Sequence, residues 1–120
     1  MESMFERYGG FAKVSRVVSS FYDRVLESPI MGPYFHDIDM KRQIDHQTKF
    51  IAFLMGGPAS YSDEHLKFIH QRMKIERRAL EEMVELMTET LEDFDFSDTD
   101  IDIVRRELLS RANLIVAEGP

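Results

Sequence analysis

The spacing of apolar residues is the feature that most limits what this chain can fold into. Along most of the sequence these residues recur three and four positions apart, as in Val14, Val17, Val18, Phe21 and Val25, rather than at every second position. Positions with this spacing lie on one face of an α-helix, whereas a half-buried strand requires alternation. The pattern therefore predicts an all-α protein.

Turn-forming residues divide this pattern into helices. Pro29, Gly32 and Pro33 interrupt the apolar spacing and predict a tight corner rather than a continuous helix. Ser62 and Ser97 precede acidic first turns, so we expect both to be N-caps. The expected helices cover residues 10–27 as one helix or as a short and a longer one, about 39–55, 63 to about 91 as one helix or two, and about 98–116.

Length and composition limit the class of protein. A chain of 120 residues with 43% hydrophobic and 31% charged residues is typical of one soluble domain, residues 1–120. No apolar stretch approaches the roughly 20 residues that span a bilayer, and we see no secretion signal, so we expect a cytoplasmic protein that does not bind membranes. The absence of cysteine excludes disulfides and thiolate metal sites. A net charge of -7 argues against nucleic acid as a partner.

Two histidines lie on the inward faces of neighbouring predicted helices. The side chains that share these faces are Gln43, Gln47, Phe50 and Leu54 with His46, and Leu66 and Met73 with His70. A Gly-Gly-Pro reversal separates the two helices, so the imidazoles can oppose each other. Neutral imidazole is a good iron ligand, and opposed imidazoles suit the two axial sides of a flat iron macrocycle. Periodicity alone leaves the alternative open that each histidine is an ordinary core or boundary residue.

The remaining candidates for metal binding are weaker. His65 points roughly 140° away from His70 at about 100° per helical residue, which favours exposure to solvent. His36 lies in the predicted corner. A zinc site lacks both cysteine and a histidine pair four residues apart. We interpret Met83 and Met87, at helical spacing, as core residues rather than iron ligands.

In order and spacing, the residues of this chain resemble the truncated haemoglobins of the globin superfamily, and within them group one, the N type. The resemblance covers nearly the whole chain. The residues that carry it are Gly9-Gly10, Phe21-Tyr22, Phe35 with DIDM shortly after it, Gln43, His46-Gln47, Phe50, Gly56-Gly57 and His70. It implies a truncated globin fold, in which helices pack two over two around a haem.

The resemblance also implies how the haem is held. His70 is expected to be the proximal ligand of the iron, and Phe35 matches the aromatic residue that packs on the porphyrin. We expect Leu66 and Met73, on the same stripe as His70, to contact the haem. No histidine follows His70, so the late histidine that bonds covalently to a haem vinyl group in some relatives is missing. An exchangeable b-type haem is expected.

On the distal side of the haem, the resemblance assigns roles to five residues. Tyr22, Gln43 and Gln47 match the positions that hydrogen-bond an iron-bound diatomic ligand, and Phe50 matches an aromatic residue of the pocket wall. His46 matches a position that binds the iron itself in some relatives when no external ligand is present. Phenol and amide donors in a dry pocket stabilise the partial negative charge of bound O₂. Taken singly, these polar side chains are also compatible with ordinary core or helix-surface positions.

The function implied is the reversible binding and transport of O₂, with NO and CO as further ligands, by a monomer or weak dimer. One alternative is NO dioxygenation with an external reductase, since the chain has no room for a flavin or nicotinamide domain. Another is a helical sensor or interaction domain that has lost the haem.

One segment departs from the family pattern. After His70 the chain is a few residues shorter than is usual in the family, and it lacks the glycine that commonly separates the proximal helix from the next one. The proximal helix is therefore expected either to continue or to be joined to the next helix by a tighter turn.

Overall fold

The computed structural model of the chain describes residues 2–59 and 75–112, and the elements that it assigns in these ranges are helical. These elements are α1 (Met4–Arg7), α2 (Gly10–Glu27), the short 3-10 helix η1 (Gly32–Phe35), α3 (Met40–Leu54), α5 (Arg77–Asp93) and α6 (Asp98–Ser110). The all-α prediction is confirmed. None of the helices in these two ranges is long and apolar enough to cross a membrane.

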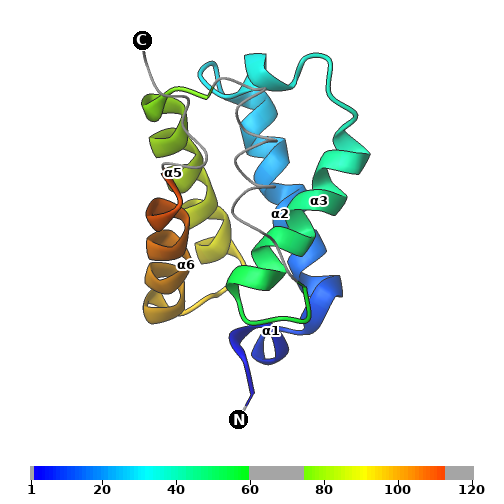
Figure 1. Cartoon of the computed structure of the whole chain (residues 1–120), viewed down its shortest axis with the longest axis vertical. Helices are drawn as coiled ribbons and strands as arrows, with labels where there is room; N and C mark the ends of the chain where they lie inside the picture. Colours follow the sequence, from blue (N-terminus) through cyan, green and yellow to red (C-terminus); the bar gives the residue numbers. More distant parts are fainter. Residues whose placement is uncertain (1, 60–74, 113–120) are drawn as a thin grey trace.

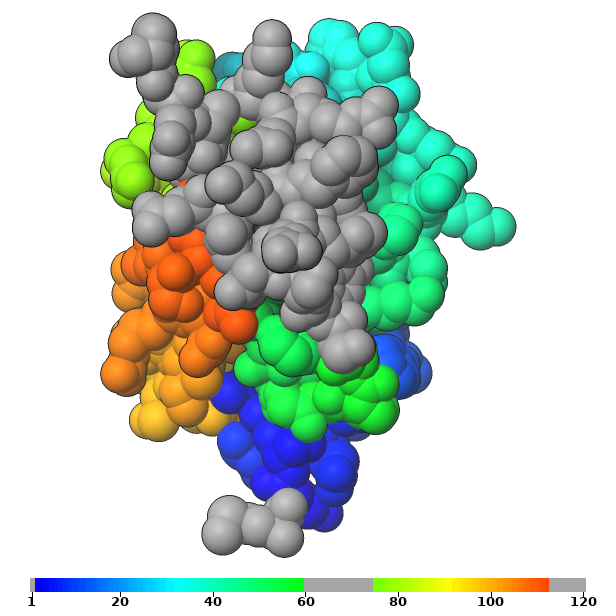
Figure 2. Space-filling model, viewed as in Figure 1, coloured from blue at the N-terminus to red at the C-terminus, as the bar shows by residue number. Residues whose placement is uncertain are grey.

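The long helices form two pairs. Figure 1 shows α2 beside α3 in one pair and α5 beside α6 in the other, and α2 also packs against α5. The space-filling view shows α6 along one edge of the same face and α3 along the opposite edge (Figure 2). The arrangement therefore places the inward faces of all four helices around one centre.

Local sequence explains where most of these helices begin and end. Asp39 has an extended backbone before α3, and its Oδ1 accepts a hydrogen bond from the Arg42 N–H at 3.3 Å. Ser97 caps α6 in the same way, with its Oγ accepting from the Asp100 N–H at 3.2 Å. Gly56 has a φ of 83° just after α3, a conformation that glycine adopts without a steric penalty. The predicted start near Asp39, the N-cap Ser97 and the glycine stop are confirmed.

The remaining helix boundaries compare with the prediction as follows. Helix α2 is undivided, which was one of the two alternatives, because no helix-breaking residue occurs between Gly10 and Glu27. The short helix α1 was not predicted; its burial of Met4 and Phe5 depends on tertiary packing. Helix α6 is assigned to Asp98–Ser110, and the Arg111 N–H donates to the preceding carbonyls. The predicted end near residue 116 lies outside the described residues.

The sequence left two alternatives for the segment after His70, a helix that continues or a tighter turn. Helix α5 begins at Arg77, which excludes the continuous helix. Glu76 has an extended backbone and lies before the first helical residue, so a helix does not continue through this position. Its N–H donates to the hydroxyl of Tyr34, in η1, at 3.3 Å. The predicted helix start at 63, with Ser62 as N-cap, lies outside the described residues.

The hydrophobic core lies between the two helix pairs. Its largest fully buried apolar side chains are Val14, Val17, Val18 and Val25 of α2, Ile51 of α3, Leu80 and Leu91 of α5, and Val104 of α6. The predicted inward stripe of α2 is thereby confirmed from Val14 to Val25, but Phe11, which the same spacing also placed on the stripe, is 42% exposed. Burial of each such side chain contributes on the order of 1.5–3 kcal/mol to folding.

A buried carboxylate joins the N-terminal segment to the start of α6. The Asp100 side chain is 7% exposed and accepts hydrogen bonds from Arg7 Nη1 and Nη2 at 2.9 and 3.0 Å and from Tyr8 Oη at 2.6 Å. The Arg7 guanidinium is the largest cause that lowers the pKa of Asp100 to about 2, against the opposing effect of burial. Tyr8 also stacks on Phe96, with ring centroids 3.7 Å apart.

Replacing Asp100 with asparagine is expected to lower the free energy of unfolding near pH 7 by about 1–2 kcal/mol. This value is smaller than the pKa shift alone would give, because Arg7 is half-exposed and solvent screens the ion pair. Because the folded-state pKa is below the unfolded one, this contribution is present above about pH 4 and is lost as the pH falls toward about 2. Urea unfolding at about pH 7 and about pH 3 measures both effects.

The exposed pair of Asp102 and Arg106 on the same helix provides the matched control. Asp102→Asn is expected to change the free energy of unfolding by less than about 1 kcal/mol. Equal effects of the two asparagine substitutions would contradict a stabilising role for the buried carboxylate.

Candidate functional site

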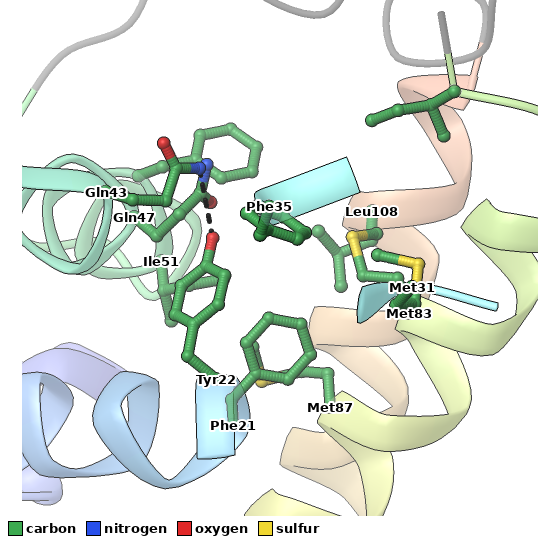
Figure 3. A pocket seen from close by; sticks show the side chains of 12 residues that line it. Phe21, Tyr22, Met31, Phe35, Gln43, Gln47, Ile51, Met83, Met87 and Leu108 are labelled. Atoms are coloured by element: carbon green, nitrogen blue, oxygen red, sulfur yellow. Dashed lines mark hydrogen bonds between the residues drawn. The ribbon is translucent and has the colours of Figure 1, made fainter. Parts of the chain in front are cut away.

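A cavity of about 40 Å³ lies in the middle of the fold (Figure 3). The described residues that line it are Phe21 and Tyr22 of α2, Met31 and Phe35 of the corner, Gln43, Gln47, Phe50 and Ile51 of α3, Ile75, Met83 and Met87 in and before α5, and Leu108 of α6. Both helix pairs and the corner contribute to the lining. Its walls are therefore mostly aromatic, aliphatic and thioether groups, with few polar side chains.

The polar side chains of the cavity come from α2 and α3. Gln43 and Gln47 lie one turn apart on α3, and Gln43 Nε2 donates a hydrogen bond to Tyr22 Oη at 3.1 Å (Figure 3). The ring of Tyr22 is buried and stands edge-on to the ring of Phe35, with centroids 5.5 Å apart. Phe50 is buried on the same helix as the two glutamines. The fold thus brings these five predicted site residues together at one cavity.

The opposite wall consists of residues that sequence reasoning did not assign to the site. Figure 3 shows Met31, Met83 and Leu108 across the cavity from the glutamines of α3. Met83 and Met87 were predicted as core residues from their helical spacing, and they do pack with the core while also lining the cavity. Met31 lies outside the long helices, so no periodic signal identified it. Its position near prolines and a glycine could have indicated only a corner.

Not every predicted site residue lies at this cavity. His46 is half-buried on α3 and is not among the described residues that line the cavity. It is rotated by about 100° around the helix from Gln47, which does line it. His70, Leu66 and Met73 lie outside the described residues. The predicted role of His46 as an iron ligand therefore stays a prediction.

The chemistry of the lining fits a flat, mostly apolar macrocycle. Aromatic and thioether side chains supply apolar contact, and a tyrosine hydroxyl with two amides gathers on one side, where hydrogen bonds can orient a small ligand. Within residues 2–59 and 75–112, no group of three or more histidine, aspartate or glutamate side chains is placed to hold a metal ion. The arrangement supports the binding of a small ligand beside a macrocycle.

Comparison with known proteins gives consistent matches. A model of the bacterial-like globin family matches residues 3–115. A group 1 truncated haemoglobin from Tetrahymena thermophila is 29% identical over 96 residues, which cover 80% of this chain and 79% of that protein.

Solved structures agree in fold. The 2/2 haemoglobin from Synechococcus sp. PCC 7002, in the cyanomet state and with covalently attached haem, has a TM-score of 0.88 and 25% identity, covering 96% of this chain and 98% of that one. The truncated haemoglobin from Tetrahymena pyriformis in its Fe(III) form has a TM-score of 0.84 and 23% identity, covering 98% and 100%. The predicted resemblance and the two-over-two fold are confirmed.

Proposed function

This chain belongs to the bacterial-like globin family, and on that premise we propose that it holds a b-type haem at the central cavity and reversibly binds O₂, with NO and CO as further ligands. Family membership implies globin-type binding of a ligand at haem in general. The observation that carries the more specific proposal is the cavity, with apolar walls and Tyr22, Gln43 and Gln47 on one side. When bound, haem supplies an iron atom that takes a diatomic gas.

His70 is the proposed proximal ligand of the iron, with Leu66 and Met73 in contact with the haem beside it. Phe35 is the proposed packing partner of the porphyrin. Its ring is buried, lines the cavity and contacts the ring of Tyr22, which supports this role. An aromatic ring held in this way offers a macrocycle a large apolar contact at little cost in side-chain entropy.

Tyr22, Gln43 and Gln47 are the proposed donors to the gas ligand. The hydrogen bond from Gln43 Nε2 to Tyr22 Oη makes the phenol oxygen an acceptor and holds the ring on the cavity side of α2. Gln47, one turn further along α3, brings a second amide to the same wall. Phe50 is buried beside them and excludes water, and low local polarity strengthens hydrogen bonds to a ligand that carries partial negative charge.

Tyr22→Phe and Gln47→Leu are each expected to raise the rate of O₂ release. A lost hydrogen bond to a partly charged acceptor costs about 1–3 kcal/mol, which corresponds to roughly five- to a hundredfold if the loss falls wholly on dissociation. Stopped-flow displacement of O₂ by CO measures the rate. The rate of CO release is expected to change less, because bound CO carries less charge.

Tyr34→Phe is the matched control for this prediction. It also removes one tyrosine hydroxyl, but that hydroxyl accepts from the backbone of Glu76 and does not line the cavity. Its O₂ release rate is expected to equal that of the wild type. If Tyr22→Phe and Gln47→Leu release O₂ no faster than Tyr34→Phe, other residues line the ligand pocket.

The haem is proposed to be exchangeable. Covalent attachment of the haem, as in some relatives, requires a histidine late in the sequence, and no histidine follows His70. Titration of the purified chain with haemin is expected to give an intense Soret band that saturates at one haem per chain, and acidic butanone is expected to extract the haem. A chain that gives no Soret band on haem addition would instead be a haem-free helical sensor or interaction domain.

NO dioxygenation with an external reductase remains the alternative activity, and the proposed setting is the cytoplasm, with the chain as a monomer or weak dimer. Stopped-flow mixing of the oxygenated protein with NO separates turnover from simple binding. Nitrate formed repeatedly in the presence of a reductase system would support the dioxygenase, whereas a single stoichiometric reaction without re-reduction would support a ligand-binding role.

A further inference from the structure

The corner between α2 and α3 brings two buried side chains to the wall of the central cavity. These are Met31, just before η1, and Phe35, its last residue, so neither is held by a long helix (Figure 3). We propose that Ser28 and Glu82 are positioning residues, which hold the corner against α5 and thereby fix its two cavity side chains against the porphyrin. This inference rests on the proposed function, because it concerns how the haem is held.

Ser28 organises the start of the corner. It is buried directly after the last residue of α2, and its Oγ accepts hydrogen bonds from the N–H groups of Ile30 at 3.3 Å and Met31 at 3.1 Å. Its carbonyl oxygen accepts from the Gly32 N–H at 2.8 Å. Three consecutive backbone N–H groups therefore donate to one residue. Serine side chains that bond to the backbone ahead of them fix turns in this way, so Ser28 sets the path of the chain into η1.

Glu82 couples this turn to α5. The Ser28 hydroxyl has one proton, and it donates that proton to Glu82 Oε2 at 2.9 Å. Because the carboxylate takes the proton, the lone pairs of Oγ remain for the two backbone N–H groups. A hydrogen bond to a carboxylate is also stronger than one to a neutral acceptor. Glu82 is half-buried and directly precedes Met83, which lines the cavity, so this bond joins two walls of the cavity.

The corner depends on such contacts for its position. Helix η1 has four residues, and so short a helix is not stable without tertiary contacts. Dispersion contacts weaken steeply when two surfaces separate by roughly 0.5–1 Å. A small displacement of the corner is therefore expected to take Met31 and Phe35 out of contact with the porphyrin and to weaken haem retention, while the long helices stay folded.

Ser28→Ala is the first test, because it removes the hydroxyl and little else. The full chain is loaded with haemin and mixed with an excess of apomyoglobin, which captures every haem that is released, and absorbance follows the transfer. Haem loss from Ser28→Ala is expected to be about five- to tenfold faster than from the wild type, which is the effect of about one lost hydrogen bond.

Ser97→Ala is the matched control. It also removes a serine hydroxyl and lowers the stability of the fold, because Ser97 Oγ caps α6, but Ser97 does not line the cavity or contact the corner. Its rate of haem loss is expected to equal that of the wild type. If Ser28→Ala loses haem no faster than Ser97→Ala, the proposal is overturned.

Two substitutions of Glu82 test the pairing. Glu82→Leu removes the acceptor and is expected to speed haem loss as Ser28→Ala does. Glu82→Gln keeps a carbonyl oxygen that can accept from the hydroxyl, so it is expected to keep the wild-type rate. Combining Ser28→Ala with Glu82→Leu is expected to add little to either change alone, because the two residues act as one unit. Fully additive effects would contradict the pairing.

Nuclear magnetic resonance of the carbonmonoxy form provides a readout that does not depend on haem release. In Ser28→Ala, the amide protons of Ile30 and Met31 are expected to exchange with solvent about tenfold faster, with no change in α6. The ring protons of Phe35 are expected to shift, because the ring current of the porphyrin acts over a short distance. Unchanged Phe35 resonances would overturn the proposal even if exchange were faster.

The same measurements separate this inference from the proposed function. A wild-type chain that gives no Soret band with haemin would refute the proposed function, and the positioning role with it. A wild type that binds haem, together with a Ser28→Ala variant equal to it in haem loss and in Phe35 resonances, would refute the positioning role alone.

Discussion

Replacing His70 with alanine is expected to abolish stable haem binding, whereas replacing His65 with alanine leaves haem binding intact. Helical spacing predicts that only His70 shares a stripe with Leu66 and Met73, and that His65 lies roughly 140° around the helix from His70. Loss of the proposed proximal bond removes a strong directional contact between the chain and the iron. Haem content, measured as Soret absorbance per chain after gel filtration, is expected to fall close to zero in His70→Ala only.

Two further measurements make this experiment decisive. Far-ultraviolet circular dichroism is expected to show both variants to be helical, so that loss of haem is not loss of the fold. Added imidazole is expected to restore a Soret band to His70→Ala by occupying the vacated axial position. If both variants retain haem equally, the proximal assignment is wrong.

Local sequence predicted the helices whose limits depend on local residues. The start of α3 at Asp39 and the start of α6 after Ser97 follow from side chains that cap their own helices. The break before α5 has a different origin, because neither Ile75 nor Glu76 is a turn-forming residue. There the Glu76 N–H donates to Tyr34 Oη, a contact between positions far apart in the chain. Patterns in a single sequence do not show such tertiary contacts.

The candidate site, like the helix limits, was predictable from the sequence only in part. Tyr22, Gln43 and Gln47 share helical stripes with apolar residues, and the resemblance gave them roles, so their meeting at one cavity was expected. The thioether wall was not expected, because helical spacing distinguishes an inward face from an outward one but not a cavity from a filled core. Met83 lines the cavity because α5 packs beside α2, and Met31 lines it because the corner packs against α2.

His46 is expected to bind the iron opposite His70 when no external ligand is present, giving a six-coordinate low-spin haem. His46 lies on α3 between Gln43 and Gln47, both of which line the cavity, and it is half-buried. A neutral imidazole nitrogen is a good ligand for haem iron. The competing arrangement places His46 at the pocket rim against a haem propionate, with the glutamines holding a water on the iron.

Which of these two arrangements forms depends on whether α3 rotates and moves toward the haem. His46 lies about 100° around the helix from Gln47 and is not among the described residues of the cavity wall, so α3 must move toward the haem for the bond to form. Absorption spectra of the ferric and deoxy-ferrous wild type are expected to be low-spin, and those of His46→Leu high-spin. His36→Leu, which removes an exposed histidine in the corner, is the control and is expected to remain low-spin.

Ligand kinetics provide the second part of this prediction. When His46 occupies the iron, an incoming gas must wait for the imidazole to leave. The observed rate of O₂ binding to the wild type is therefore expected to level off as the O₂ concentration rises, at the rate of His46 dissociation. His46→Leu removes this step, so its binding rate is expected to rise linearly with concentration and to exceed that of the wild type. High-spin spectra in both proteins, together with linear binding in the wild type, would show that His46 does not bind the iron.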